Sequence, residues 1–294
     1  MSRREDERRG LWEAVKGKVQ KTAGRQSQRA EGKHIQKEAG FFLAAVLVLV
    51  AITLAGEGLW DGAMVSDFSK KNLKPCLSYP FGTDWMGRDV FLRTICGLSL
   101  SIRIGCLTAG ISAVIAFFMG IFAAMGKWAD YVVCMLIDLV MGIPHMLLLV
   151  LISFAVGKGL FGVIVGISLT HWTSLARLIR GEVLGLKEAP YMKISLKLGT
   201  GRLQAAVRHM TPHLLPQVFV GAILLFPHAI LHEAGITFLG FGLSPEQPAV
   251  GIILSESMRY LAMGKWWLSL FPGLMLVMVV ILFHYLGKKV QMFF

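Results

Sequence analysis

Six apolar stretches divide this chain, and each is long enough to cross a lipid bilayer as a helix. About 20 apolar residues are needed, because the hydrocarbon core is about 30 Å thick and a helix rises about 1.5 Å per residue. Lipid offers no hydrogen-bond partners, so a spanning segment must satisfy its backbone internally. The sequence therefore predicts an all-α, polytopic membrane protein with six transmembrane helices. Their predicted ranges are residues 39–57, 98–124, 131–153, 160–178, 214–235 and 267–287.

The composition excludes an ordinary soluble domain, since 55% of the 294 residues are hydrophobic. The net charge of +12 is concentrated in residues 1–38 and in the polar loop 180–213, which lies between apolar stretches. Basic segments of this kind mark the cytoplasmic side of a membrane protein and do not require a nucleic-acid partner. With an even number of spans, we expect both termini in the cytoplasm and the protein in the plasma or inner membrane.

The segments outside the apolar stretches complete the predicted domain organisation. Residues 1–38 form a basic cytoplasmic tail without the cleavage site of a secretory signal, so the first span is retained. Residues 58–97 form an extracytoplasmic loop, and residues 98–290 form a core of five helices. The cysteines lack Cys-x-x-Cys spacing, which argues against a disulfide framework or a zinc ribbon. They are Cys76, Cys96, Cys106 and Cys134.

The loop 180–213 is the longest polar and basic insert between apolar stretches. Its first half predicts a short helix with Tyr191, Ile194 and Leu198 on one face. Gly199 is expected to end that helix, because glycine adopts the left-handed backbone common at helix C-termini.

A second short helix is expected after this glycine. Pro212 and Pro216 are expected to stop it and to start the next apolar run. Its apolar residues at helical spacing are Leu203, Ala206, Val207 and Met210.

The same loop resembles the cytoplasmic coupling loop, or EAA loop, of ATP-binding cassette permeases. In that pattern nine residues separate a glycine from an apolar residue or histidine, and one further residue precedes Leu-Pro. Gly199, His209 and Pro212 keep this spacing, whereas Lys193-Ile194-Ser195 replaces Glu-Ala-Ala and Thr211 replaces the leucine. The resemblance implies that the loop inserts into a groove on a separate ATPase subunit. The residues expected to serve this docking are Glu188, Tyr191, Ser195, Gly199, His209 and Pro212.

A second motif, Gly-Thr-Asp-Trp-Met-Gly-Arg-Asp, ends at Asp89 just before the second apolar stretch. Its glycines, threonine and aspartates predict a tight turn followed by a helix N-cap. It also resembles the GTDxxGRD signature of the dipeptide, oligopeptide and nickel permeases, which implies that it faces an extracytoplasmic solute-binding protein. The residues carried over are Gly82, Thr83, Asp84, Gly87, Arg88 and Asp89.

Further motifs follow in the order of that family. They are Trp128-Ala129-Asp130 with Asp138 and Pro144, then Phe238 to Gly242, and then Phe271-Pro272-Gly273. The chain therefore resembles a permease of a type I importer, which implies a second permease as heterodimer partner, two ATPase subunits and a lipid membrane. The usual acidic ending reads Gly287-Lys288-Lys289 here, which affects only the cytoplasmic terminus. No Gly-x4-Gly-Lys-Ser/Thr motif occurs, so we expect no cofactor on this chain and ATP use by the partner subunits.

Histidines inside the apolar stretches predict a substrate pathway. His228 and His232 are four residues apart and share a helical face, which is a metal-ligand spacing. The surrounding residues resemble the nickel-type second permease, and ionisable groups within a membrane point to function. We expect His228, His232 and His145 to line the pathway, with His228 and His232 as transient metal ligands. Neutral histidines hydrogen-bonded between helices are the alternative, and His171 is expected to pack near Trp172.

Three other residues carry structural expectations. Asp138 is expected to pair with a basic residue of the coupling loop, with a gating role as the alternative. Pro144 is expected to kink the third span, and Arg103 to reach the outer interface.

Taken together, these patterns predict a non-enzymatic permease subunit that imports nickel, another metal chelate or short peptides. Two other classes fit less well. An ion-coupled secondary transporter would show inverted repeats, and no clear internal repeat is present. A membrane metalloenzyme is suggested by His232-Glu233, the start of His-Glu-x-x-His, but Ile236 occupies the position of the second histidine.

Overall fold

The computed structural model describes residues 39–292. The chain divides into two units, residues 1–48 and 49–294. The described residues of the first unit belong to the helix Ala39–Gly58, which continues into the second. The predicted basic tail, residues 1–38, lies outside the described residues.

Helices make up most of residues 39–292, and this part of the chain contains no β-strand, which confirms the predicted all-α fold. After the first helix come α2 (Trp60–Met64), the 3-10 turn η1 (Phe68–Lys70), α3 (Val90–Ala124), α4 (Lys127–Met141), α5 (His145–Val156), α6 (Leu160–Glu188), α7 (Pro190–Lys197), α8 (Arg202–Ala205), the π-helical turn η2 (Ala206–Met210), α9 (Thr211–Phe238), α10 (Val250–Leu261) and α11 (Trp267–Gln291).

Five stretches of the described chain are helices long and apolar enough to cross a membrane. They are Ala39–Gly58, α3, α6, the continuous segment Arg202–Phe238, and α11. A sixth span results if α4 and α5 are counted as one, although these two helices are bent by 94° at their junction. The structure thus agrees with five to six spans and shows that the third predicted span, residues 131–153, is broken.

The break between α4 and α5 has a local cause in the sequence. Pro144 stands at the N-cap of α5 with an extended ψ of 121°. Proline has no amide hydrogen, and it disfavours helical backbone in the residue before it. The predicted bend at Pro144 is therefore confirmed, and it is a complete break between two helices rather than a kink within one. The bend sets His145 at the first position of the new helix.

The second span begins at Val90, earlier than the predicted start at residue 98, which shortens the predicted outer loop 58–97. The Asp89 side chain accepts hydrogen bonds from the backbone amides of Phe91 and Leu92 and so caps the helix. Arg93 lies in the first turn of this helix, where it is 1% exposed and paired with acidic groups.

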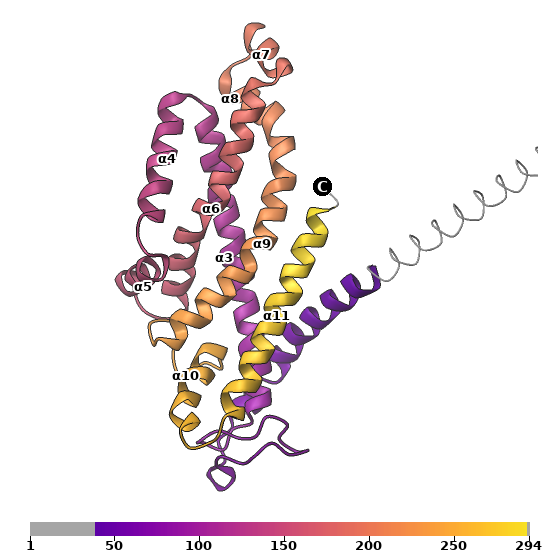
Figure 1. Cartoon of the computed structure of the whole chain (residues 1–294), viewed down its shortest axis with the longest axis vertical. Coiled ribbons are helices and arrows are strands. Elements are labelled where there is room, and N and C mark those ends of the chain that lie inside the picture. The colour runs from indigo at the N-terminus through magenta and orange to yellow at the C-terminus, as the bar shows by residue number, and fades with distance from the viewer. Residues whose placement is uncertain (1–38, 293–294) are drawn as a thin grey trace, which may run out of the picture. The chain divides into compact units, whose positions relative to one another are not determined.

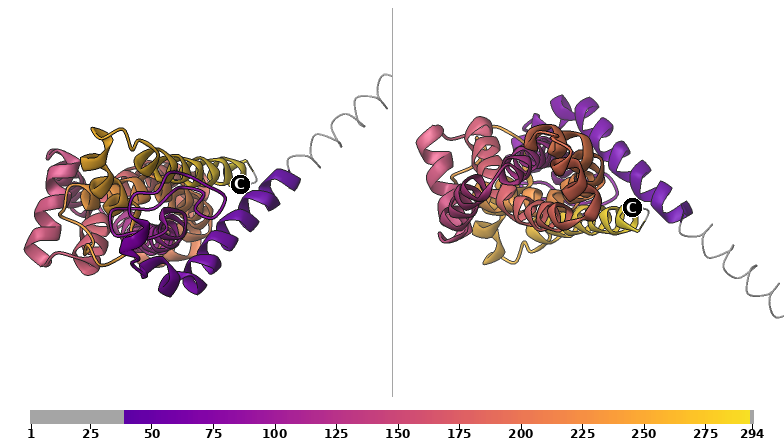
Figure 2. Two further views of the ribbon diagram at one scale, coloured as in Figure 1. Left: turned by 90° about the horizontal axis from the view of Figure 1, so that it is seen from below. Right: turned by 90° about the horizontal axis from the view of Figure 1, so that it is seen from above.

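In the second unit, α3 runs through the middle and packs most extensively against α6 and α9 (Figure 1). Small residues allow these helices to approach closely, as expected for packing in lipid. A Cβ atom added to Gly120 would collide with Ile179 of α6, and one added to Gly221 of α9 would collide with Leu175. Seen end-on in Figure 2, α5 and α11 lie on opposite sides of this central group.

The two ends of the bundle carry different structures (Figure 1). The short helices α7 and α8 lie at one end. The segment before α3 lies at the other end, together with α10. The helix α10 was not predicted from the sequence. There Val90, Ile253 and Trp267 form an apolar cluster, and Phe81 stacks on Phe271 with ring centroids 4.9 Å apart. The fold thus separates the two predicted docking regions along the length of the helices.

Candidate docking loop and substrate pathway

The α7 segment ends as the sequence predicted. Gly199 has a φ of +91°, a left-handed conformation that suits glycine. The amide of Thr200 donates to the carbonyl of Ser195 at 3.2 Å, and the amide of Gly199 donates to that of Leu196 at 3.2 Å. These bonds satisfy carbonyls that the helix end would leave free, so the glycine bend is a fixed feature of the loop.

The second half of the loop differs from the prediction, because Pro212 and Pro216 do not separate a short helix from the next span. Residues Arg202–Phe238 run as one helical segment. The π-helical turn η2 precedes Pro212, and within it the Thr211 amide donates to the carbonyl of Ala206. This wider turn accommodates a proline, whose ring conflicts with the preceding turn of an α-helix. The short helix α8 is therefore continuous with α9 through this turn.

The predicted apolar face of α7 is exposed. Tyr191 is 43% exposed, Ile194 57% and Leu198 81%, whereas Met192 on the opposite side is buried. Exposed apolar side chains on a polar loop commonly mark a contact surface. We call Tyr191, Ile194 and Leu198 the α7 apolar face.

The other predicted docking residues lie around this face. Lys193 pairs with Glu188 at 2.6 Å on the exposed side. The Ser195 hydroxyl donates to Thr200 Oγ1 at 3.0 Å and lies 3.4 Å from Nε2 of His209. Pro212 lies in the first turn of α9. The structure thus gathers most of these residues at one end of the bundle, and their role in docking stays a prediction.

The loop is fastened to the corner between α3 and α4. The Lys187 ammonium donates to the carbonyl of Ala123 at 2.8 Å, and Arg202 donates to that of Met125 at 3.3 Å. Nearby, Asp138 lies 3.3 Å from Arg177, a basic residue just before the loop, and both side chains are largely exposed.

At the opposite end, the Gly-Thr-Asp motif forms the predicted tight turn and N-cap. Gly87 has a φ of +78°, and a Cβ there would collide with the carbonyl of Asp67, so only glycine fits. The Thr83 hydroxyl accepts from the Leu73 amide at 2.8 Å and donates to the Lys70 carbonyl at 2.5 Å. Burial raises the pKa of the Asp89 carboxyl, and the amides that it caps partly oppose this shift.

The charged residues of this motif point inward. Asp84 Oδ2 accepts from Arg88 at 2.7 Å and from Arg93 at 2.6 Å. Glu256 of α10 lies 2.8 Å from Arg93 and 3.3 Å from Arg88. These four residues, which we call the buried ion network, tie the motif to α3 and α10. Thr83, Asp84 and Arg88 were predicted to face a binding protein, and their side chains instead fix the surface from within.

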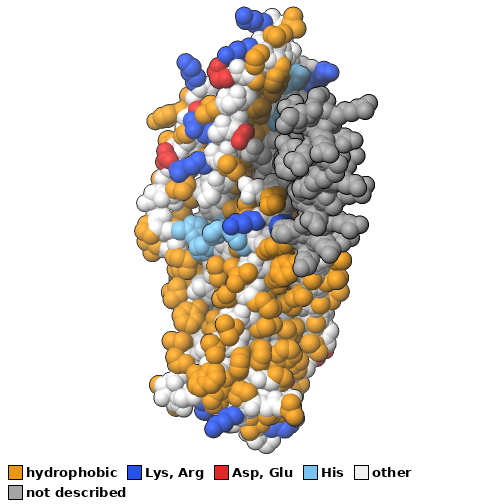
Figure 3. All heavy atoms as spheres, turned by 45° about the vertical axis from the view of Figure 1, so that its right-hand side comes forward, with side chains coloured by type: hydrophobic (Ala, Val, Ile, Leu, Met, Phe, Trp, Pro, Cys, Tyr) orange, Lys and Arg blue, Asp and Glu red, His pale blue; other side chains and the backbone are white. Residues whose placement is uncertain are grey.

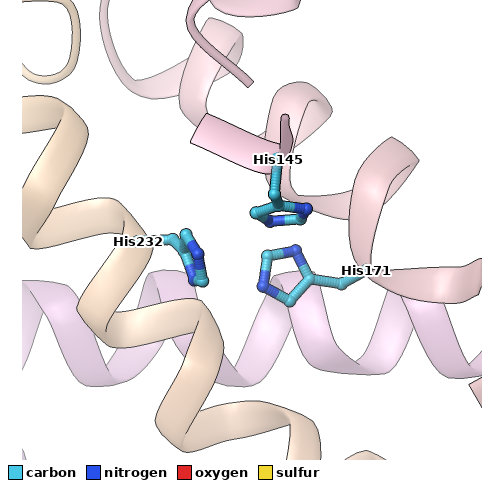
Figure 4. Close-up of side chains that lie close together, drawn as sticks. All are labelled: His145, His171 and His232. Carbon is cyan, nitrogen blue, oxygen red and sulfur yellow. The ribbon is translucent and has the colours of Figure 1, made fainter. Parts of the chain in front are cut away.

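Three histidine rings converge near the break between α4 and α5 (Figure 4). They belong to His145 at the start of α5, His171 of α6 and His232 of α9. The ring centroids are separated by 4.7 Å for His145 and His171, 4.5 Å for His145 and His232, and 5.0 Å for His171 and His232. We call these residues the histidine triad.

The triad differs from the predicted pair. His228 contributes its backbone carbonyl, which lies 2.7 Å from Nδ1 of His232, and its own side chain is exposed. His171, predicted to pack near Trp172, is 5% exposed and joins the cluster. All four histidines line one open groove with Ser174. On the face drawn in Figure 3, histidines form a patch between the apolar surface and the charged end.

Two further ionisable groups lie along the helices. Glu233 is fully buried, and its carboxylate accepts from the Ser101 hydroxyl at 2.5 Å and the Thr237 hydroxyl at 3.1 Å. Sequence reasoning weighed it only as part of an incomplete enzyme motif, although an acidic residue inside an apolar stretch was signal enough. Arg103 pairs with Glu57 at 2.5 Å, and both side chains are about half exposed.

Comparisons with known proteins agree with this geometry. Residues 116–291 match the family model described as binding-protein-dependent transport system inner membrane component. A protein of Brucella suis biovar 1 (strain 1330), whose name describes a peptide permease, is 31% identical over 90% of this chain and 88% of its own length. The dipeptide transport system permease protein of Bacillus subtilis (strain 168) is 29% identical, over 86% of this chain and 79% of its own length.

Proposed function

Because this chain belongs to the family of binding-protein-dependent transport system inner membrane components, we propose that it forms half of a translocation path, with a second permease supplying the other half. Membership makes it a membrane permease subunit of an ATP-binding cassette importer of the dipeptide and oligopeptide type, and not an enzyme. The proposal concerns where its path, partners and cargo lie.

The observation that carries the proposal is the open groove beside the histidine triad. It is lined by α5, α6 and α9, with four histidines and Ser174 among apolar side chains. Polar groups that face lipid are costly, so such a groove fits against a partner subunit or an aqueous path. A second permease packed over this face would enclose a route between the two.

The proposed drive comes from two ATPase subunits at the α7 apolar face. The face is exposed, the helix end at Gly199 is fixed, and α8 is continuous with α9. A push on this loop would therefore move α6 and α9 as rigid bodies, and with them both sides of the groove. Basic residues gather in the loop, which supports a cytoplasmic position for this end and for both termini.

The solute-binding protein is proposed to dock at the opposite end. The buried ion network holds the Gly-Thr-Asp turn in place, and Trp85 of that turn is 40% exposed. The signature thus supports docking by shaping the surface, whereas direct contact falls to exposed neighbours such as Trp85.

Short peptides are the proposed cargo, in line with the names of the two relatives. A metal ion or metal chelate, including nickel, is a second candidate, and the clustering of imidazoles beside the groove favours it. The two cargoes make different demands, because a peptide needs hydrogen-bond partners whereas a metal needs imidazole ligands.

Uptake into proteoliposomes tests the proposal. The complex would contain this chain, the second permease and the ATPases. The solute-binding protein and either labelled dipeptide or radioactive nickel would be added on the extracytoplasmic side. We expect uptake of one cargo that requires both ATP and binding protein. Uptake driven by a proton gradient without ATP would contradict the proposal and favour the secondary-transporter class.

A further inference from the structure

The histidine triad joins three separate helices at one point in the membrane region. His145 comes from α5, His171 from α6 and His232 from α9. One ring nitrogen from each lies within 4.8 Å of the others, and Figure 4 shows the rings grouped around a common centre. Residues so far apart in sequence meet here because the 94° break at Pro144 turns His145 toward α6 and α9.

Hydrogen bonds fix the orientation of two of the rings. Nδ1 of His171 lies 3.0 Å from the carbonyl of Ile167, and Nδ1 of His232 lies 2.7 Å from the carbonyl of His228. A carbonyl oxygen can only accept, so each Nδ1 carries the hydrogen and each Nε2 keeps a free lone pair. Histidines that bind metals commonly have this arrangement, in which one ring nitrogen donates to a backbone carbonyl and the other faces the metal.

Two ring nitrogens of the triad lack hydrogen-bond partners. Nε2 of His145 and Nε2 of His171 are buried and have no hydrogen-bond partner in the described part of the chain. Buried polar atoms in proteins are nearly always satisfied. Two such atoms beside each other, with a third imidazole aimed at the same place, call for a ligand that accepts electron pairs.

We propose that His145, His171 and His232 bind one divalent transition metal ion of the class of Ni²⁺, Co²⁺, Cu²⁺ and Zn²⁺. Imidazole suits these ions, whereas Mg²⁺ and Ca²⁺ require oxygen ligands. In a tetrahedral site with nitrogen at about 2.0 Å, ligand atoms lie about 3.3 Å apart. The ring nitrogens lie within 4.8 Å of one another, so binding would require the rings to rotate closer together.

The site has three protein ligands and opens on the groove, so a fourth position is left for water or for a donor atom of a chelate. Open positions of this kind allow exchange, unlike the closed four-ligand sites that hold structural zinc. The inference goes beyond the proposed function, because it assigns a metal to this chain whether the cargo is a peptide or a chelate.

Cobalt titration of the purified, metal-free permease complex tests the site without ATP and without transport. Co²⁺ bound to imidazoles gives visible absorption bands, and we expect one bound equivalent per copy of this chain. Replacing His145, His171 or His232 singly by Asn should weaken cobalt binding by at least about 100-fold. Removing a group that only hydrogen-bonds a metal ligand typically costs less than this. His284→Asn, an exposed histidine of α11 outside the cluster, should leave the titration unchanged.

Two further variants keep the outcome decisive. His145→Cys, in a background without the native cysteines, should retain the metal and add a thiolate-to-cobalt charge-transfer band, which shows direct ligation in a folded protein. His228→Asn should retain the metal as well. The proposal is overturned if the wild type gives no cobalt bands above those of a variant in which His145, His171 and His232 are all replaced by Asn. It is equally overturned if His228→Asn abolishes binding, because the ligands would then be the pair on α9.

Discussion

Arg180 of α6 donates two parallel hydrogen bonds to Asp130 of α4, from Nε to Oδ1 at 2.6 Å and from Nη2 to Oδ2 at 2.9 Å. Both side chains are mostly buried. Planar guanidinium and carboxylate groups paired in this way hold a defined geometry as well as a charge. The pair therefore locks α4 to the part of α6 that leads into the docking loop.

Arg180→Met is predicted to loosen this link. A hydrogen bond to a charged group contributes about 1.5–3 kcal/mol to stability, and Asp130 would lose both of its hydrogen bonds from Arg180. We expect the ratio of substrate uptake to ATP hydrolysis in proteoliposomes to fall several-fold while the complex still assembles. Arg177→Met serves as the matched control, because Arg177 makes a single contact of 3.3 Å with an exposed partner. Equal losses in the two variants would argue against a specific link.

Gly199→Val is predicted to uncouple the loop. The φ of +91° is strained for a side chain with a branched Cβ, at a cost of about 1–2 kcal/mol. A Cβ there meets nothing within 4 Å in the described chain, so the expected effect within this chain is backbone strain and not a clash. Transport should fall while ATP hydrolysis continues.

Gly201→Val offers the control two residues away. Gly201 has a φ of −62° and a ψ of 148°, which any residue adopts, and its Cβ position is also open among the described residues. We expect near-normal coupling. Wild-type uptake by an assembled Gly199→Val complex would count against the loop as the point of energy transfer.

Arg93→Met is predicted to destabilise the complex. The change leaves Asp84 and Glu256 as neighbouring carboxylates, of which Asp84 is 6% exposed, without their central partner. Removing one member of a buried ion pair costs about 3–5 kcal/mol. Thermal unfolding of the purified complex should show a clearly lower midpoint. Lys70→Met, which breaks an exposed pair with Asp67, should not shift it, and a similar shift in both would contradict the account.

Cysteine accessibility is predicted to place the two ends of the bundle on opposite sides of the membrane. In a background without the four native cysteines, an impermeant thiol reagent should label Lys71→Cys and Glu246→Cys from outside. Gln204→Cys should react only after the membrane is opened. All three positions are exposed in the structure. Labelling of position 204 in intact cells would overturn the cytoplasmic position of the loop.

Local chemistry in this chain was readable from the sequence. Gly199 was assigned the bend that the structure shows, and the motif that ends at Asp89 was assigned a turn and an N-cap, because these roles depend on a few neighbouring residues. Pro144 was assigned a kink for the same reason. The match to the family model likewise confirms the resemblance to the permease family. That resemblance could be recognised without knowledge of the packing, because it rests on motifs in a fixed order.

Features that depend on distant contacts were not readable. The apolar pattern continues across Pro144, so nothing in it shows a 94° break. Helical spacing placed His228 and His232 on one face, but which rings meet depends on how α5, α6 and α9 pack. The early start of the second span was missed as well, because Arg93 is buried there only through its partners Asp84 and Glu256, which lie on other segments.

Photocrosslinking from the α7 apolar face tests the central claim most directly, namely that this loop receives the ATPase. A benzoylphenylalanine replaces Ile194 in one complex and Leu151 of α5, an equally exposed apolar residue, in another. Both are irradiated in complexes that hydrolyse ATP. The account predicts an ATPase adduct from position 194 and none from position 151. An active complex that gives no ATPase adduct from position 194, or one that reacts equally from both positions, would contradict it.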